Sequence, residues 1–136
     1  MTQPPAPLAL FSPPGVARPG GHYSHATCVG DLVFVSGQLG IRPDGSHTFQ
    51  LPFAEQARQA LDNVLAVLEG CGLDAGALAK VTVYVADIGY WPEFDALYAE
   101  SLGQHRPARA VVPVPALHYG YQIEIEAIAV RASCAR

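Results

Sequence analysis

Residues 52–70 constrain the fold most, because a strong helical pattern interrupts a sequence that otherwise alternates as strands do. Apolar residues recur there three or four positions apart, and the charged residues fall mostly on the other side. Pro52 suits the first turn of a helix, and Gly70 or Gly72 suits the left-handed position after its end. The recurring apolar residues are Ala57, Leu61, Val64, Leu65 and Leu68. This pattern predicts an amphipathic helix.

Strand patterns lie on both sides of this helix, and a second helical pattern follows it. The predicted strands are residues 8–11, 23–28, 32–36, 78–87, 109–114 and 122–130, and the second helix is residues 92–102. The residues that face the core are expected to be Val81, Val83 and Val85 in one strand, Phe94, Leu97, Tyr98 and Leu102 in the second helix, and Ile123, Ile125, Ala127 and Ala129 in the last strand. A turn over residues 29–31 would join the second and third strands into a hairpin.

The order of these patterns predicts an α+β fold in which both helices pack on one face of a mixed, six-stranded sheet. A chain of 136 residues fits one domain with a real core. Residues 1–20 form a proline-rich strand and loop, and residues 21–132 form the main domain.

The composition of the chain bears on its subunit contacts and on its cellular compartment. Charged residues make up 15% of the chain, below the usual share of about 25%, which hints at surface buried between subunits. No apolar run reaches the roughly 20 residues that span a bilayer, and the N-terminus does not resemble a secretory signal. Three cysteines without metal-like spacing favour reduced thiols, so a cytoplasmic protein is expected.

Charge and histidine spacing argue against two classes of partner. The net charge is −4, and the eight Lys and Arg residues are scattered, so a nucleic-acid backbone is a poor ligand. His22 and His25 lack a third ligand at useful spacing, and the other histidines lie apart, so we expect no metal and no cofactor. Ser36 has no His-Asp arrangement that would make it a nucleophile.

Arg109 and Glu124 are the strongest candidates for chemistry. Arg109 begins an apolar strand, and Glu124 and Glu126 alternate with isoleucines in the last strand, which we expect to lie next to it. A guanidinium can hold a substrate carboxylate with paired hydrogen bonds, and a nearby glutamate can activate a water. The alternative without a catalytic role is that Arg109 is a surface arginine at the end of a strand and that Glu124 and Glu126 are solvated carboxylates.

Several strings in this order resemble the RidA/YjgF family of enamine/imine deaminases, also described as endoribonuclease L-PSP-like. The resemblance runs from about residue 20 to residue 130. It is carried by residues 21–26 (GHYSHA), 35–40 (VSGQLG), 56 and 61–64 (Q, LDNV), 80–85 (KVTVYV), 98 (Y), 107–109 (PAR) and 123–129 (IEIEAIA).

The resemblance implies a chorismate-mutase-like fold, a barrel-like homotrimer and active sites between subunits. It also implies cofactor-free hydrolysis of 2-imino acids to 2-keto acids and ammonia, which removes reactive intermediates. Family residues map onto Arg109 as the carboxylate clamp and Glu124 as the water-handling glutamate. Tyr23 is the cleft tyrosine, which could equally be a core residue, and Ser36 with Gly37 forms part of the cleft wall.

Three positions of the predicted substrate site affect which substrate would fit. Val111 stands where members of the family often carry a cysteine, so no thiol acts there, although a backbone amide would still be available. Asp95 stands where many members carry asparagine, which adds an acid near the cleft. Tyr121 belongs to an aromatic segment, residues 118–121, that suggests a wider pocket.

Two other functions remain open at this point. A protein of the same fold could bind small keto or hydroxy acids without catalysis, as a sensor that keeps the arginine clamp. A ribonuclease is a third reading, which the acidic charge and the lack of a basic groove oppose. In the deaminase reading, the partner is a small carboxylate substrate, with no nucleic acid and no membrane.

Overall fold

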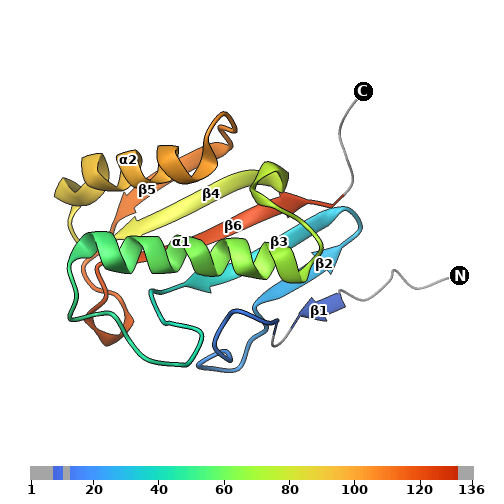
Figure 1. Ribbon diagram of the computed structural model, residues 1–136, viewed down its shortest axis with the longest axis horizontal. Coiled ribbons are helices and arrows are strands. Elements are labelled where there is room, and N and C mark those ends of the chain that lie inside the picture. Colours follow the sequence, from blue (N-terminus) through green and yellow to red (C-terminus); the bar gives the residue numbers. More distant parts are fainter. Residues whose placement is uncertain (1–7, 11–12, 132–136) are drawn as a thin grey trace, which may run out of the picture.

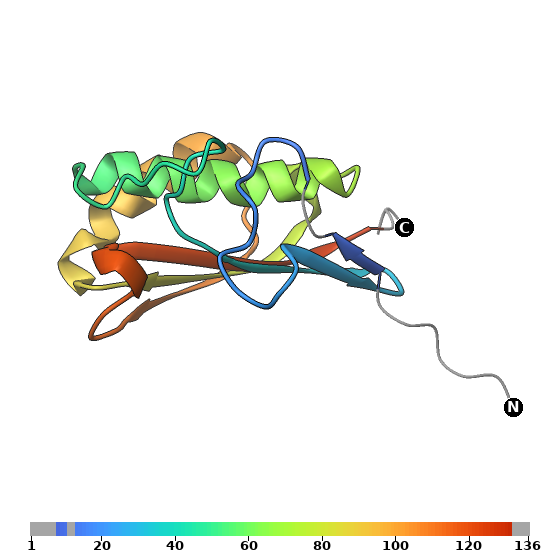
Figure 2. The ribbon, with the colours of Figure 1, turned by 90° about the horizontal axis from the view of Figure 1, so that it is seen from below.

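A computed structural model of the chain describes residues 8–10 and 13–131. It shows a mixed sheet with helices α1 and α2 on one face, so the predicted α+β class is confirmed (Figures 1 and 2). The strands are β1 (Leu8–Leu10), β2 (Ala26–Val29), β3 (Leu32–Gln38), β4 (Leu78–Val85), β5 (Ala108–Pro113) and β6 (Ile123–Val130), and the helices are α1 (Phe53–Gly70) and α2 (Trp91–Leu102). Three short 3-10 turns join them, η1 (Ala75–Ala77), η2 (Ile88–Tyr90) and η3 (His118–Gly120).

The strand order is β1-β2-β3-β6-β4-β5, and it places the chain's last strand in the middle of the sheet. Strands β2 to β6 form its body, and β1 pairs antiparallel with β2 at one edge. β4 and β5 are parallel and joined by α2, whereas the other neighbours are antiparallel. The predicted first strand included Phe11, which lies outside the described residues.

The core lies between the sheet and the two helices. All eleven residues predicted to face inward from β4, α2 and β6 are buried. Of the apolar residues that predicted α1, four are buried and Leu65 is only partly so. Gly72, at φ 77°, supplies the left-handed position after α1, as one of the two predicted glycines.

Two strand boundaries differ from the sequence pattern. β2 begins at Ala26 rather than residue 23, because the preceding residues leave the sheet to form a loop. β3 continues to Gln38 rather than residue 36, because its pairing with β6 resumes after a bulge. Val35 pairs with Ala127 and Gln38 with Ile125, so Ser36 and Gly37 together oppose the single residue between those partners.

Two buried amides of α1 hold the long loop that follows β3. The Gln56 amide nitrogen donates to the carbonyls of Phe49 (3.2 Å) and Leu51 (3.0 Å), and its oxygen accepts from the Gln122 backbone at 2.9 Å. The Asn63 amide nitrogen donates to the carbonyls of residues 39 and 41, at 2.9 and 2.8 Å. Since these carbonyls would otherwise be costly to bury, both amides fix the loop to the helix.

Neither α1 nor α2, the two α-helices in the described part of the chain, is long and apolar enough to cross a membrane. Cys28 and Cys71 are present as free thiols, and Cys134 lies outside the described residues.

The close packing at Gly40 gives a test of this fold. A Cβ added there would lie 2.6 Å from the Thr48 hydroxyl and 2.9 Å from the Gln56 backbone oxygen, which cannot move freely. We expect Gly40→Ala to lower the free energy of unfolding by roughly 2 kcal/mol, measured by urea denaturation. Gly20→Ala is the matched control, because its Cβ would meet nothing closer than the Tyr119 hydroxyl at 3.7 Å. Equal stability of the two variants would contradict the packing described.

Candidate active site

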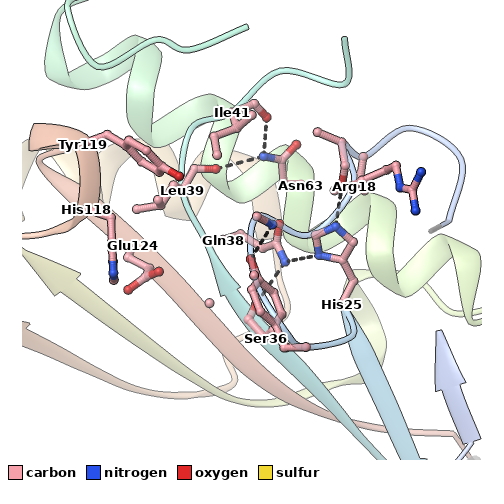
Figure 3. Close-up of a pocket in the computed structure, with 16 residues that line it drawn as sticks. Arg18, His25, Ser36, Gln38, Leu39, Ile41, Asn63, His118, Tyr119 and Glu124 are labelled. Carbon is pink, nitrogen blue, oxygen red and sulfur yellow. Dashed lines mark hydrogen bonds between the residues drawn. The ribbon is translucent and has the colours of Figure 1, made fainter. Parts of the chain in front are cut away.

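A cleft of about 440 Å³ opens where β3 ends, and it is the best candidate for a ligand site (Figure 3). Its walls come from the N-terminal loop before β2, from the end of β3 and the residues after it, from α1 through Asn63, and from η3 and the start of β6. Of the residues predicted for the site, the lining includes Tyr23, Ser36, Gly37 and Glu124.

Glu124 lies over Gly37, in contact with the bulge of β3. A Cβ at position 37 would be 2.9 Å from a carboxylate oxygen of Glu124 and 3.0 Å from its Cδ. Only glycine therefore leaves this carboxylate in its present position. The bulge and the close approach together place the acid in the wall of the cleft, rather than on an open strand surface.

The environment of Glu124 favours its protonated form. Partial burial raises the pKa of this carboxyl above its usual value, because water no longer fully solvates the charge. His118, which lies beside the carboxylate in Figure 3, lowers the pKa, and the nearby acid Glu126 raises it. The net upward direction suits a group that must both accept and return a proton.

A buried hydrogen-bond chain positions the N-terminal loop against β3. His25 Nε2 lies 2.6 Å from the Ala17 carbonyl oxygen, and His25 Nδ1 lies 3.0 Å from the Gln38 amide nitrogen. Because a carbonyl only accepts, Nε2 carries the proton and Nδ1 accepts from Gln38. The same amide nitrogen donates to the Ser36 carbonyl at 3.1 Å. His25 therefore has a structural role here, which the sequence did not reveal.

Two predicted wall residues differ in how freely they face the cleft. Tyr23 is 45% exposed, and its hydroxyl accepts a weak hydrogen bond from the Gly20 backbone at 3.4 Å. The Ser36 hydroxyl donates to the Ser24 carbonyl at 2.6 Å, which fixes the start of β2 against the bulge. Tyr23 can therefore contact a ligand with its ring, whereas the Ser36 hydroxyl already has a partner.

Arg109 lies in a different part of the molecule, between β5 and α2. Its Nη1 donates to the carboxylate of Asp95 at 2.7 Å, and its Cζ lies 5.0 Å from the centre of the Tyr98 ring and 6.0 Å from that of Phe94. The arginine side chain is 23% exposed and that of Asp95 is 48% exposed. The guanidinium is thus held by one ion pair and by stacking against the rings of α2.

The expectation that Arg109 and Glu124 lie on neighbouring strands is wrong. β4 runs between β5 and β6, and Arg109 pairs with the buried Val81, so its side chain is on the helix face. Glu124 pairs with Tyr84, and the neighbours of both residues along their strands are buried against the helices. The Glu124 side chain is therefore on the opposite face. Since side chains of a strand alternate between faces, one chain cannot bring the two groups together without unpairing strands.

Tyr98 carries the clearest unexplained polar group near Arg109. Its hydroxyl is buried and has no hydrogen-bond partner among the residues that the structure describes. Burial raises the pKa of this phenol to about 12, and only Arg109 lowers it. The phenol therefore stays neutral, and its ring supplies packing for the arginine.

The remaining predicted residues lie outside the cleft. Val111 is partly buried on β5, where it pairs with Val83 of β4. Tyr121 is 1% exposed, and its hydroxyl accepts from the Thr48 backbone at 3.1 Å and lies 2.8 Å from His47 Nδ1. Tyr121 therefore holds the loop that contains His47 and Thr48, and it does not face the cleft. Tyr119, two residues earlier and 58% exposed, lines the cleft instead.

The sequence missed other lining residues, including Gln38 and Asn63. His118, the first residue of the predicted aromatic segment, also lines the cleft. The aromatic run at residues 118–121 signalled this wall, but not which of its tyrosines faces the cleft. Among the residues that the structure describes, no group of three His, Cys, Asp or Glu side chains could hold a metal ion.

The raised pKa of Glu124 predicts a pH-dependent stability. The unfolded carboxyl has a pKa near 4.5, and the folded one lies above it, so stability falls as the pH rises from 4.5 through the folded value. We expect Glu124→Gln to raise the free energy of unfolding at pH 7.5, and this gain to disappear below pH 4.5. Urea denaturation at both pH values measures it. Glu100→Gln, exposed on α2, is the control, and a gain at Glu124 that ignores pH would refute this cause.

The chain is similar in sequence to known proteins. The family described as endoribonuclease L-PSP matches residues 15–131. Protein HMF1 of Saccharomyces cerevisiae is 37% identical over 123 residues, which cover 90% of this chain and 92% of that protein. The 2-iminobutanoate/2-iminopropanoate deaminase of Escherichia coli K12 is 40% identical over 116 residues, 82% of this chain and 88% of the enzyme.

Solved structures are also similar to this chain in fold. The crystal structure of the YjgF gene product from Escherichia coli superposes with a TM-score of 0.82 at 34% identity, covering 90% of this chain and 98% of that one. The match therefore extends over nearly the whole fold. The chain belongs to the RidA/YjgF family.

Proposed function

We propose that this protein hydrolyses 2-imino acids to 2-keto acids and ammonia. The observation that carries the proposal is Glu124, a half-buried carboxyl with a raised pKa in the wall of a cleft, in a chain whose relatives include named imine deaminases. A carboxyl whose pKa is raised in this way can act as a general acid and base. Imines also hydrolyse without a catalyst, so a modest site suffices.

The proposed reaction needs only water and proton transfers. Water attacks the imine carbon, a C–O bond forms, and the C=N electron pair moves to nitrogen, which takes up a proton. Glu124 accepts a proton from the attacking water and returns one to the nitrogen. The hydroxyl of this intermediate then gives its proton through Glu124 to the amino nitrogen, the C–N bond breaks with its electron pair going to nitrogen, ammonia leaves and the C=O bond of the keto group forms. Every atom of the keto acid and ammonia comes from the imino acid and one water.

Arg109 is the proposed clamp for the substrate carboxylate, and it requires a second chain. Because Arg109 and Glu124 are on opposite faces of one sheet, we assign each complete site to an Arg109 from one subunit and a Glu124 from its neighbour. A closed homotrimer with three such sites is the assembly that we propose. Its contact surface would include the uncovered face of the sheet (Figure 2) and the β5 edge that carries Arg109.

The apolar character of this uncovered face supports such an assembly. Leu32 and Phe34 are 42% and 40% exposed on β3, and they pair with Val130 and Ile128 of β6. Val112 is next to Tyr84 on the same face. Leu32, Phe34, Ile128 and Val130 are adjacent on this face, and covering them would remove apolar surface from water and stabilise an oligomer.

Removal of either proposed catalytic group tests the reaction. We expect Arg109→Ala and Glu124→Gln each to reduce catalysed ammonia release about 100-fold, from an imine made in place by an amino-acid oxidase. Arg106→Ala and Glu100→Gln are matched controls, since both residues are exposed and neither lines the cleft. We expect both controls to retain full rates.

Other outcomes of this assay favour other functions. Saturable binding of pyruvate that depends on Arg109, without any acceleration of ammonia release, would replace the enzyme with a keto-acid sensor. Cleavage of RNA that persists in Glu124→Gln protein after washing at high salt would favour the ribonuclease reading. Equal deaminase rates in all five proteins would end the proposed mechanism.

Mixed oligomers test whether the two groups come from different subunits. Arg109→Ala and Glu124→Gln proteins, each inactive alone, are unfolded together in denaturant and refolded as a 1:1 mixture. In a cyclic trimer about one quarter of the sites would then combine an intact Arg109 with an intact Glu124 from the next subunit. We expect activity to return to that extent. A mixture as inactive as its components would show that the site does not cross subunits.

A further inference from the structure

The Arg109 guanidinium is already paired with a carboxylate of its own chain. Asp95 accepts one hydrogen bond from Nη1 at 2.7 Å, and the Tyr98 ring packs against the guanidinium. Arginine is a planar donor with several N–H groups, so a single contact leaves other donors for a ligand. The arginine can therefore bind a second carboxylate, but only one that comes close to Asp95.

This arrangement sets up a competition between two like charges. A substrate carboxylate on Arg109 would lose part of its attraction, because Asp95 already offsets the arginine's charge. It would also be repelled by Asp95, whose side chain is 48% exposed and so only partly screened. A ligand with a second negative charge would suffer this repulsion twice.

We propose that Asp95 is a specificity-determining residue that weakens carboxylate binding at Arg109 and directs the site toward substrates with a single negative charge. This inference rests on the proposed function for the identity of the reaction. The selectivity rests on the ion pair between Arg109 and Asp95. The favoured substrates are 2-imino acids with uncharged side chains. Dicarboxylic imino acids are disfavoured.

The position of Asp95 makes an exchange to asparagine informative. Asparagine keeps the size of the side chain and an oxygen that accepts from Nη1, so it preserves the orientation of Arg109 while it removes the charge. Alanine removes both the charge and the contact. A comparison of these two variants therefore separates an electrostatic role from a positioning role.

The test measures dissociation constants of pyruvate and 2-oxoglutarate by calorimetry, which needs no catalysis. We expect Asp95→Asn to lower the dissociation constant of pyruvate about tenfold and that of 2-oxoglutarate by a larger factor. Both factors should become smaller as the salt concentration rises. Glu93→Gln is the control for net charge, because Glu93 is exposed on the same helix and should change neither constant.

Contrary outcomes are equally clear. Unchanged binding in Asp95→Asn, with weaker binding in Asp95→Ala, would show that Asp95 only positions Arg109 and would overturn the inference. A gain of the same size for both acids would overturn the selectivity, and so would a gain that ignores salt. An absence of binding in every variant would also refute the proposal.

The ammonia assay keeps this inference separate from the proposed function. If Asp95→Asn binds keto acids more tightly as expected but neither it nor the wild type releases ammonia, the deaminase proposal fails and the role of Asp95 stands. If the wild type is an active deaminase and Asp95→Asn has an unchanged KM, the role of Asp95 fails alone. A lower KM at constant kcat is the expected result, because the charge acts on binding.

Discussion

Side chains alternate along β4 and β6, and this alternation divides the charged residues of the candidate site between two sides of one sheet. The apolar residues of both strands must face the helices, since they form the core. Glu124 is therefore fixed on the uncovered face, and the partners of β5 keep Arg109 on the helix face. A slip by one residue would exchange the faces, but it would also expose the core, so the division is enforced by the main stabilising force of the fold.

The cleft depends on a second, more local constraint, which is the bulge of β3. Ser36 and Gly37 leave the regular pairing there, and the resulting bend brings Gly37 under the Glu124 carboxylate. The network of His25 and Gln38 then ties the N-terminal loop to the same bulge. The burial that raises the pKa of Glu124 costs stability. Such a cost is expected where a carboxyl is held for use rather than for packing.

Periodicity predicted the elements and the buried face of each, because hydrophobic burial acts locally along a helix or strand. It did not predict the strand order, which depends on how the chain crosses over, so Arg109 and Glu124 were wrongly placed on neighbouring strands. Tyr119 and Tyr121 could not be told apart either. Their orientation depends on the 3-10 turn that contains Tyr119 at a positive φ of 61°, a local geometry that an aromatic run does not signal.

Arg109 already has a partner within its own chain, and this bears on what drives assembly. Its guanidinium is paired with the Asp95 carboxylate, and burial favours the neutral form of Glu124. An unsatisfied charge is therefore a poor reason for subunits to associate, whereas the apolar row of β3 and β6 is a good one. Apolar contact would then hold the subunits together, and the charges would decide what binds between them. Under these proposals, exchanging aspartate and asparagine at position 95 would alter selectivity without disturbing the assembly.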